Sequence, residues 1–207
     1  MVDSEVSRLK FDREVQTLGE QRTTMESRGI FLLASTSYPF VELAFVPRHL
    51  LQVLMPAVQS GAIILPQGAM LAVEIPSVSA RAFKARFDLT GYDLQAPSLE
   101  FRDFWTDNRL EYATMFRALE YEKDRKAHVV LLDDHPITHK PFLCVRGIRE
   151  YHEHPQHSGD DWLLYRQQMN LFSIVMSLWR VTIDLIHPQM FYQPNGLQVN
   201  WAAEEKL

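Results

Sequence analysis

The stretch of residues 83–89 is the sequence feature that most constrains how this chain folds. Apolar and charged side chains alternate strictly along it, in the order Phe-Lys-Ala-Arg-Phe-Asp-Leu. Successive side chains of a strand point to opposite faces of a sheet, so the pattern predicts a strand with one buried and one solvated face.

Other parts of the chain predict the partners of this strand. Strands are expected over residues 30–35, 41–46, 70–75 and 98–101, at spacings that suit an antiparallel meander. Phe11, Val15, Leu18 and Met25 recur at helical spacing, which predicts an amphipathic N-terminal helix that stops near Gly29. Helices are also expected over residues 49–58 and 107–124, and a short strand over 129–132. The fold class that this order predicts is α+β.

A single domain is expected over residues 1–207, because a chain of this length can bury a core of its own. Its predicted parts are an N-terminal helix (1–29), a strand meander (30–101), an insertion (102–134), an active-site loop (135–162), a helix (163–186) and an irregular tail (187–207).

Composition excludes several classes of partner. Apolar residues make up 46% and charged residues 23% of the chain, as in ordinary globular proteins. The formal net charge of −5 argues against nucleic acid or an anionic membrane as the main partner. No apolar run approaches the roughly 20 residues of a membrane helix. The single cysteine cannot form an internal disulfide, and the N-terminus lacks the pattern of a signal peptide, so a cytoplasmic protein is expected.

Cys144 is the candidate nucleophile. His135-Pro136 precedes it by nine positions, and a histidine-rich loop, Tyr-His-Glu-His-Pro-Gln-His, follows it over residues 151–157. A thiol flanked by imidazoles is the arrangement of a covalent thiol enzyme. Cysteine is also a common small buried hydrophobe, and the apolar neighbours Phe142, Leu143 and Val145 fit that alternative.

Motifs before and after Cys144 resemble those of the ubiquitin-conjugating enzyme family. Tyr92, Pro97, Leu99 and Phe101 follow the alternating strand at the spacing of that family, and His135-Pro136 stands where the family has His-Pro-Asn before its catalytic cysteine. Downstream, the family pattern of a tryptophan that opens an apolar helix is matched by a set of four residues, Trp162, Leu171, Ile174 and Leu178. The resemblance covers residues 69–101 and 133–180.

The chain departs from the family pattern in several places, which include Ala96 in place of another proline and a longer gap from Cys144 to Trp162. Asp93 replaces a proline, about thirty residues are inserted before His135, and Ile137 stands where the family has an asparagine that stabilises the oxyanion. The whole is similar to divergent bacterial members found in operons with a ubiquitin-like protein, an activating enzyme and a JAB peptidase. Some of these gene sets serve antiphage defence.

The resemblance implies an acyl-transfer enzyme without an organic cofactor or metal. Cys144 would carry a ubiquitin-like modifier as a thioester, receive it from the activating enzyme and pass it to an amine of a protein acceptor. Because Ile137 cannot supply a polar group, a histidine is expected to replace the asparagine, with His152 or His154 favoured. In the family, the histidine at the position of His135 mainly shapes the loop. His139 is expected to be an exposed loop residue.

Three alternatives stay open. The same fold could be a binding module that recruits a modifier while Cys144 is buried and inert. The residues His152, His154, His157 and Asp160, with Cys144, are ligand types for zinc, which would make the chain a metal hydrolase. A cysteine peptidase built from Cys144 and a loop histidine is the last.

Overall fold

The protein is described here from a computed structural model. It describes residues 4–46, 82–110, 119–121, 127–129, 131–132, 135–138, 142–180, 182, 186–193 and 196–203. The expected helix over residues 49–58, the expected strand over 70–75, and His139 lie outside these ranges.

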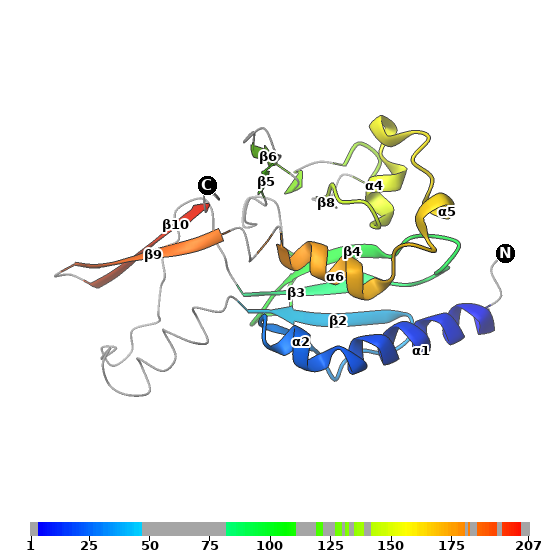
Figure 1. Cartoon of the computed structure of the whole chain (residues 1–207), viewed down its shortest axis with the longest axis horizontal. Helices are drawn as coiled ribbons and strands as arrows, with labels where there is room; N and C mark the ends of the chain where they lie inside the picture. The colour runs from blue at the N-terminus through cyan, green and yellow to red at the C-terminus, as the bar shows by residue number, and fades with distance from the viewer. Residues whose placement is uncertain are drawn as a thin grey trace.

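Four antiparallel strands form the central sheet, in the order β1-β2-β3-β4 (Figure 1). They are β1 (Ile30–Leu32), β2 (Phe40–Phe45), β3 (Phe83–Asp88) and β4 (Ser98–Asp103). Along the register, Val41 pairs with Phe87, and Phe87 pairs with Leu99. The structure is therefore a mixed α+β fold around an antiparallel sheet, as the alternation of residues 83–89 predicts.

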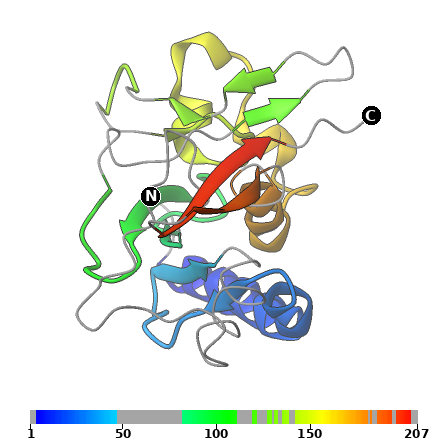
Figure 2. The ribbon, with the colours of Figure 1, turned by 90° about the vertical axis from the view of Figure 1, so that its left-hand side faces the viewer.

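One face of the sheet is fully buried. Its inward side chains are Val41, Leu43, Phe45, Phe83, Ala85 and Phe87. Helices α1 (Ser4–Glu20), α2 (Arg22–Glu26) and α6 (Leu171–Trp179) add their apolar side chains to the same core. Figure 2 shows the N-terminal helices at one end of the molecule and the segment around Cys144 at the other, with the sheet between them. The opposite face carries cross-strand charges such as the Glu42–Arg86 ion pair.

A buried carboxylate joins the first helix to the last one described. Glu14 of α1 is only 3% exposed, and its Oε2 accepts a hydrogen bond of 2.9 Å from the backbone N–H of Leu171, at the start of α6. A negative charge at a helix N-terminus satisfies an otherwise unpaired donor and interacts favourably with the helix dipole. This contact fixes α6, and therefore the chain that leads into it, against α1.

The predicted helix over residues 163–186 was wrong as one continuous element. The chain forms α5 (Trp162–Tyr165) and then α6, with residues 166–170 between them. An N-cap begins each of these two helices, and the second cap explains the break. The carboxylate of Asp161 accepts from the N–H of Leu163, and Asn170 forms a reciprocal capping box with Ser173. Side chains that bond the backbone locally compete with helix continuation.

The predicted irregular tail was also wrong. The described residues of this stretch form two antiparallel strands in register, β9 (Ile186–Gln193) and β10 (Gly196–Ala203). The sequence holds a hairpin signal in Asn195-Gly196, between two segments rich in aromatic and apolar residues. In Figure 1 the hairpin extends away from the end of the central sheet.

The predicted helix over residues 107–124 is contradicted where the structure describes it. Residues 107–110 form a loop, and β5 (Leu119–Tyr121) pairs with β6 (Ala127–Val129). Asp107 has a positive φ of 59°, which a right-handed helix does not allow. Its carboxylate accepts hydrogen bonds from Lys84 of β3 and Arg102 of β4. The short strand predicted over residues 129–132 corresponds to the end of β6 and to β7 (Leu131–Leu132).

Within the described ranges, every helix is too short or too polar to span a lipid bilayer.

Replacing Glu14 by Ala should lower the free energy of unfolding by about 2–3 kcal/mol, because the buried N–H of Leu171 loses its acceptor. Chemical denaturation with urea measures this. Asp12→Ala is the matched control, since it removes the same charge from an exposed position of the same helix and should change stability by less than about 0.5 kcal/mol. Equal stability of the two variants would contradict the role assigned to Glu14.

Candidate active site

Cys144 follows directly on a buried strand. The strand β8 (Phe142–Leu143) pairs with β7, and both of its side chains are buried. Cys144 itself is half-buried and has no disulfide partner. The thiol therefore stands at the point where the chain leaves the core, held by two buried residues on its N-terminal side.

A glycine turn on the other side of Cys144 packs against α6. Gly147 has a φ of 98°, which favours glycine. A Cβ there would lie 2.8 Å from Cε of Met169 and 2.9 Å from Cγ1 of Ile174, so a side chain does not fit. The turn brings the segment after Cys144 close to the core.

Helix α4 (Arg149–Glu153) is tied to the central sheet. The guanidinium of Arg149 donates to the carbonyl oxygens of Ala96 (3.0 Å) and Thr90 (2.9 Å), in the connection between β3 and β4. The carboxylate of Glu150 accepts from the hydroxyl of Ser98, and burial raises the pKa of Glu150. These contacts fix the loop of residues 144–160 above one edge of the sheet.

His135 shapes the segment before Cys144. It is fully buried, its Nε2 donates to the carbonyl oxygen of Glu150 (2.9 Å), and its Nδ1 accepts from the N–H groups of Ile137 and Thr138 (both 3.2 Å). Both nitrogens are thus engaged by backbone, which is the loop-shaping arrangement that the family resemblance implies. Ile137, at the position of the family's asparagine, is 60% exposed and places no polar side chain there.

His152 is held by backbone as well. Its Nε2 accepts from the N–H of Gly147 (3.3 Å), and its Nδ1 donates to the carbonyl oxygen of Asp160 (2.6 Å). A neutral imidazole offers one donor and one acceptor, and here both are used. His152 therefore joins the glycine turn to the end of the histidine loop.

His154 packs against the strand that precedes Cys144. Its Nδ1 accepts from the N–H of Gln156 (3.2 Å), and its ring stacks on Phe142 with centroids 5.5 Å apart. Burial, together with the neighbouring His135 and His157, lowers the pKa of His154 and favours the neutral ring. The two histidines that the sequence favours as helpers of the thiol thus have structural contacts of their own.

His157 is the histidine that contacts the thiol. Its Nε2 lies 3.3 Å from Sγ of Cys144, within the range of a hydrogen bond to sulfur. The 3-10 turn of Pro155–His157, which begins after His154, brings it there. From the sequence, His157 was expected by name only as a zinc ligand and was otherwise one of the histidines of the loop after Cys144. The signal that could have singled it out is the proline, which turns the loop back after position 154.

The pair can move a proton. Burial raises the pKa of the Cys144 thiol, so the resting sulfur is protonated at neutral pH and can donate to Nε2 of His157. When the sulfur attacks an electrophile, the imidazole can accept that proton. This is the chemistry of a thiol nucleophile with an adjacent general base.

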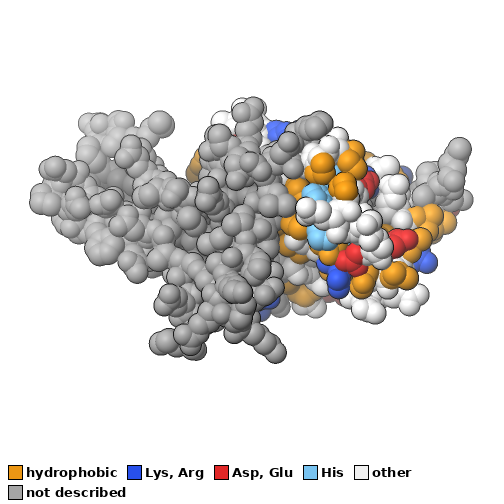
Figure 3. All heavy atoms as spheres, turned by 90° about the horizontal axis from the view of Figure 1, so that it is seen from above, with side chains coloured by type: hydrophobic (Ala, Val, Ile, Leu, Met, Phe, Trp, Pro, Cys, Tyr) orange, Lys and Arg blue, Asp and Glu red, His pale blue; other side chains and the backbone are white. Residues whose placement is uncertain are grey.

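A small cavity of about 260 Å³ adjoins His157. It is lined by the β3–β4 connection and by the histidine loop, including Gln95, Arg149, Glu153, His157 and Asp161. Seen from above, histidine side chains reach the surface of this part of the molecule among apolar and acidic ones (Figure 3). Cys144 itself is not among the residues that line this cavity, and the charged side chains of the lining are of both signs.

The described ranges hold no set of side chains that is arranged to bind zinc. No group of three or more histidine, cysteine, aspartate or glutamate side chains is arranged there to hold a metal ion. His152 and His154, two members of the set considered from sequence, direct ring nitrogens at backbone groups instead.

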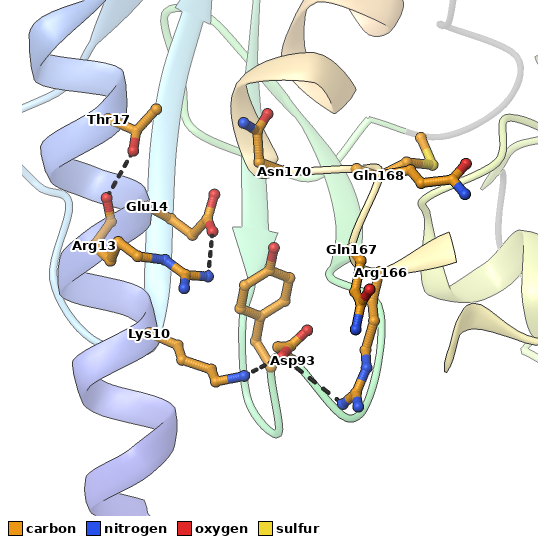
Figure 4. A pocket seen from close by; sticks show the side chains of 11 residues that line it. Lys10, Arg13, Glu14, Thr17, Asp93, Arg166, Gln167, Gln168 and Asn170 are labelled. Carbon is orange, nitrogen blue, oxygen red and sulfur yellow. Dashed lines mark hydrogen bonds and ion pairs between the residues drawn. The ribbon is translucent and has the colours of Figure 1, made fainter. Parts of the chain in front are cut away.

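A larger polar cavity of about 560 Å³ lies between α1, the Tyr92-Asp93 turn and the residues that precede α6 (Figure 4). Lys10 and Arg166 approach the carboxylate of Asp93 from opposite sides, and Arg13 donates to Glu14. These ion pairs connect the N-terminal helix to the chain that carries the site. The indole N–H of Trp162 adds a hydrogen bond of 2.9 Å to the carbonyl oxygen of Asp93.

Comparison with known proteins gives two matches. Residues 127–186, which include Cys144 and the histidine loop, match the model of the Y4jH-like family. The chain is also similar to a protein of Sinorhizobium fredii named "Uncharacterized protein y4jH", with 29% identity over 181 residues that cover 80% of this chain and 75% of that protein. The family match thus falls on the segment that carries the candidate site.

Proposed function

We propose that the protein is a ubiquitin-conjugating-like transferase that carries a ubiquitin-like modifier as a thioester on Cys144. The observation that carries this proposal is the 3.3 Å contact between the thiol and His157, at the exit of a buried strand. It is supported by the residues that resemble the family and by an antiparallel sheet with α1 and α6 on one face. The partners are the modifier, its activating enzyme and a protein acceptor, in a bacterial conjugation system that can serve antiphage defence.

Charging is a thioester exchange. The thiol proton of Cys144 moves to Nε2 of His157, and the sulfur attacks the carbonyl carbon of the modifier's thioester with the activating enzyme. A new carbon–sulfur bond forms and the old one breaks. The activating enzyme's sulfur leaves with the electron pair and takes up the proton from His157.

Transfer to the acceptor uses the same two side chains. The amine attacks the thioester carbon, its surplus proton passes to His157, and the carbon–sulfur bond to Cys144 breaks. The thiolate of Cys144 then takes the proton back, which returns the site to its starting state. His157 would in this way supply a polar group beside the thiol, which Ile137 does not.

Burial of the thiol favours a carrier over a peptidase. A thiol of raised pKa is a poorer leaving group, so its thioester resists attack by weak nucleophiles such as water. An amine is a stronger nucleophile and can still displace it. A thiol–imidazole peptidase is the second candidate, favoured by the same Cys144–His157 contact.

The first test mixes the protein with the ubiquitin-like protein and activating enzyme of its neighbouring genes and ATP, followed by a gel without reductant. We expect a band shifted by one modifier that thiol removes and that Cys144→Ala lacks. If the activating enzyme charges itself and no such band forms, the carrier function is wrong. Cleavage of a modifier-linked peptide without ATP would instead identify the peptidase.

The second prediction separates His157 from the other loop histidines. His157→Gln should slow charging of Cys144 by about 10²-fold or more, since general base catalysis contributes about 10²–10⁴. His154→Asn is the matched control, because the asparagine oxygen can still accept from the N–H of Gln156, and it should charge within about threefold of the wild-type rate. Single-turnover charging measures both, and equal losses would contradict a chemical role of His157.

A further inference from the structure

Tyr151 and Asp160 take no part in the proton transfers proposed above, yet Tyr151 contacts the ring of His157, and the carboxylate of Asp160 contacts Tyr151. The ring of Tyr151 stacks on the imidazole of His157, with centroids 3.9 Å apart and planes inclined by 22°. The hydroxyl of Tyr151 donates a hydrogen bond of 2.6 Å to Oδ2 of Asp160. The side chains thus form a chain of contacts that runs from the carboxylate of Asp160 through the phenol and the imidazole to the thiol of Cys144.

We propose that Tyr151 and Asp160 are positioning residues that stabilise the protonated form of His157 through the stacked phenol ring, and so assist deprotonation of Cys144. This inference rests on the proposed function for its biological role, but the property it concerns belongs to the protein before any modifier is attached. Asp160 acts on the base through the face of an aromatic ring, without a hydrogen bond between its carboxylate and the imidazole.

The physical basis is the attraction between a cation and an aromatic face. When His157 accepts the thiol proton, its ring becomes an imidazolium parallel to the electron-rich face of Tyr151. A hydrogen bond from the phenol to a carboxylate increases the electron density of the phenol ring. The pKa of Tyr151 is raised by burial and by Asp160, so the phenol keeps its proton and remains a donor.

The surroundings of Asp160 stabilise its ionised carboxylate. Hydrogen bonds from Tyr151 and Tyr165 and the nearby guanidinium of Arg146 lower the pKa of Asp160 to about 2. Arg146 in turn lies over the ring of Tyr165, 4.3 Å from its centroid. The carboxylate is thus ionised whenever the thiol reacts, and its position is fixed by three neighbours.

Other groups also lie near His157 or near its two partners, among them Arg146, whose guanidinium donates to Asp160. Cys144 contacts the ring, and the ring of His154 lies 5.6 Å away. The titratable and charged residues that share the adjoining cavity with His157 are Arg149, His152, Glu153, Asp160 and Asp161. The lowered pKa of His154 keeps that ring neutral near pH 7, so Tyr151 is the stacked neighbour that favours the cation.

The test measures alkylation of Cys144 by iodoacetamide in the full chain from about pH 6 to about pH 10, a range around the ordinary values of histidine and cysteine. The chain has one cysteine, so the reaction reports on Cys144 alone. At neutral pH the rate depends on proton transfer to His157, and at alkaline pH the thiolate forms without it. Each variant therefore yields two rates, one for each end of the profile.

Tyr151→Leu should lower the neutral rate about tenfold, and the isosteric variants Tyr151→Phe and Asp160→Asn about threefold each, in line with cation–π energies. The alkaline rate should stay unchanged. Combining Tyr151→Phe with Asp160→Asn should add no further loss, because Asp160 acts through the hydroxyl that phenylalanine lacks. Asp161→Asn is the matched control, since it removes the same charge from the next residue and keeps an N-cap.

Two results would overturn the inference. In one, Asp160→Asn and the Tyr151 variants keep the wild-type profile. In the other, the neutral and alkaline rates fall together, as a merely structural role would require. The proposed function fails separately, because alkylation needs no modifier: the expected profile without a thioester in the charging assay would refute the carrier and leave this inference standing.

Discussion

Burial of one face of the four-stranded sheet is the constraint on which the rest of the structure depends. The inward side chains of β2 and β3 can leave water only if helices cover them, and α1 and α6, which are far apart in the sequence, provide that cover. Because the two helices share one face, their polar groups must also be satisfied where they meet. Glu14 does this by accepting from the N–H of Leu171 in the interior.

The candidate site owes its geometry to contacts with the backbone more than to the contact between the thiol and the imidazole. His135, His152 and Arg149 each direct ring or guanidinium nitrogens at peptide groups, and together they hold the loop after Cys144 against the sheet edge. A loop fixed in this way can keep a thiol and an imidazole at 3.3 Å without help from a bound substrate. Such preorganisation reduces the cost of reaching a reactive arrangement.

Much of the fold could be predicted from the sequence. Strict alternation over residues 83–89 predicted a half-buried strand, and strands at 30–32, 40–45 and 98–103 confirm its neighbours. Predictions were wrong where local bonds override periodicity, as at Asn170, whose capping box begins a new helix inside the segment predicted as one helix. At the candidate site, the sequence pointed to Cys144 and the surrounding histidines, but the histidine that contacts the thiol was not among those favoured. His152 is nearer in sequence, yet its ring is used by Gly147 and Asp160.

The sequence by itself therefore determined the α+β class, the sheet with one buried face and the residue types gathered around one thiol. Those properties follow from the periodicity and chemistry of neighbouring residues. The tertiary structure alone decided which imidazole contacts Cys144. It also decided that Tyr151 stacks on that imidazole and donates a hydrogen bond to Asp160. The reason is that the turn at Pro155 and contacts with residues far away in the sequence together set the positions of the rings, and no local sequence pattern specifies such contacts.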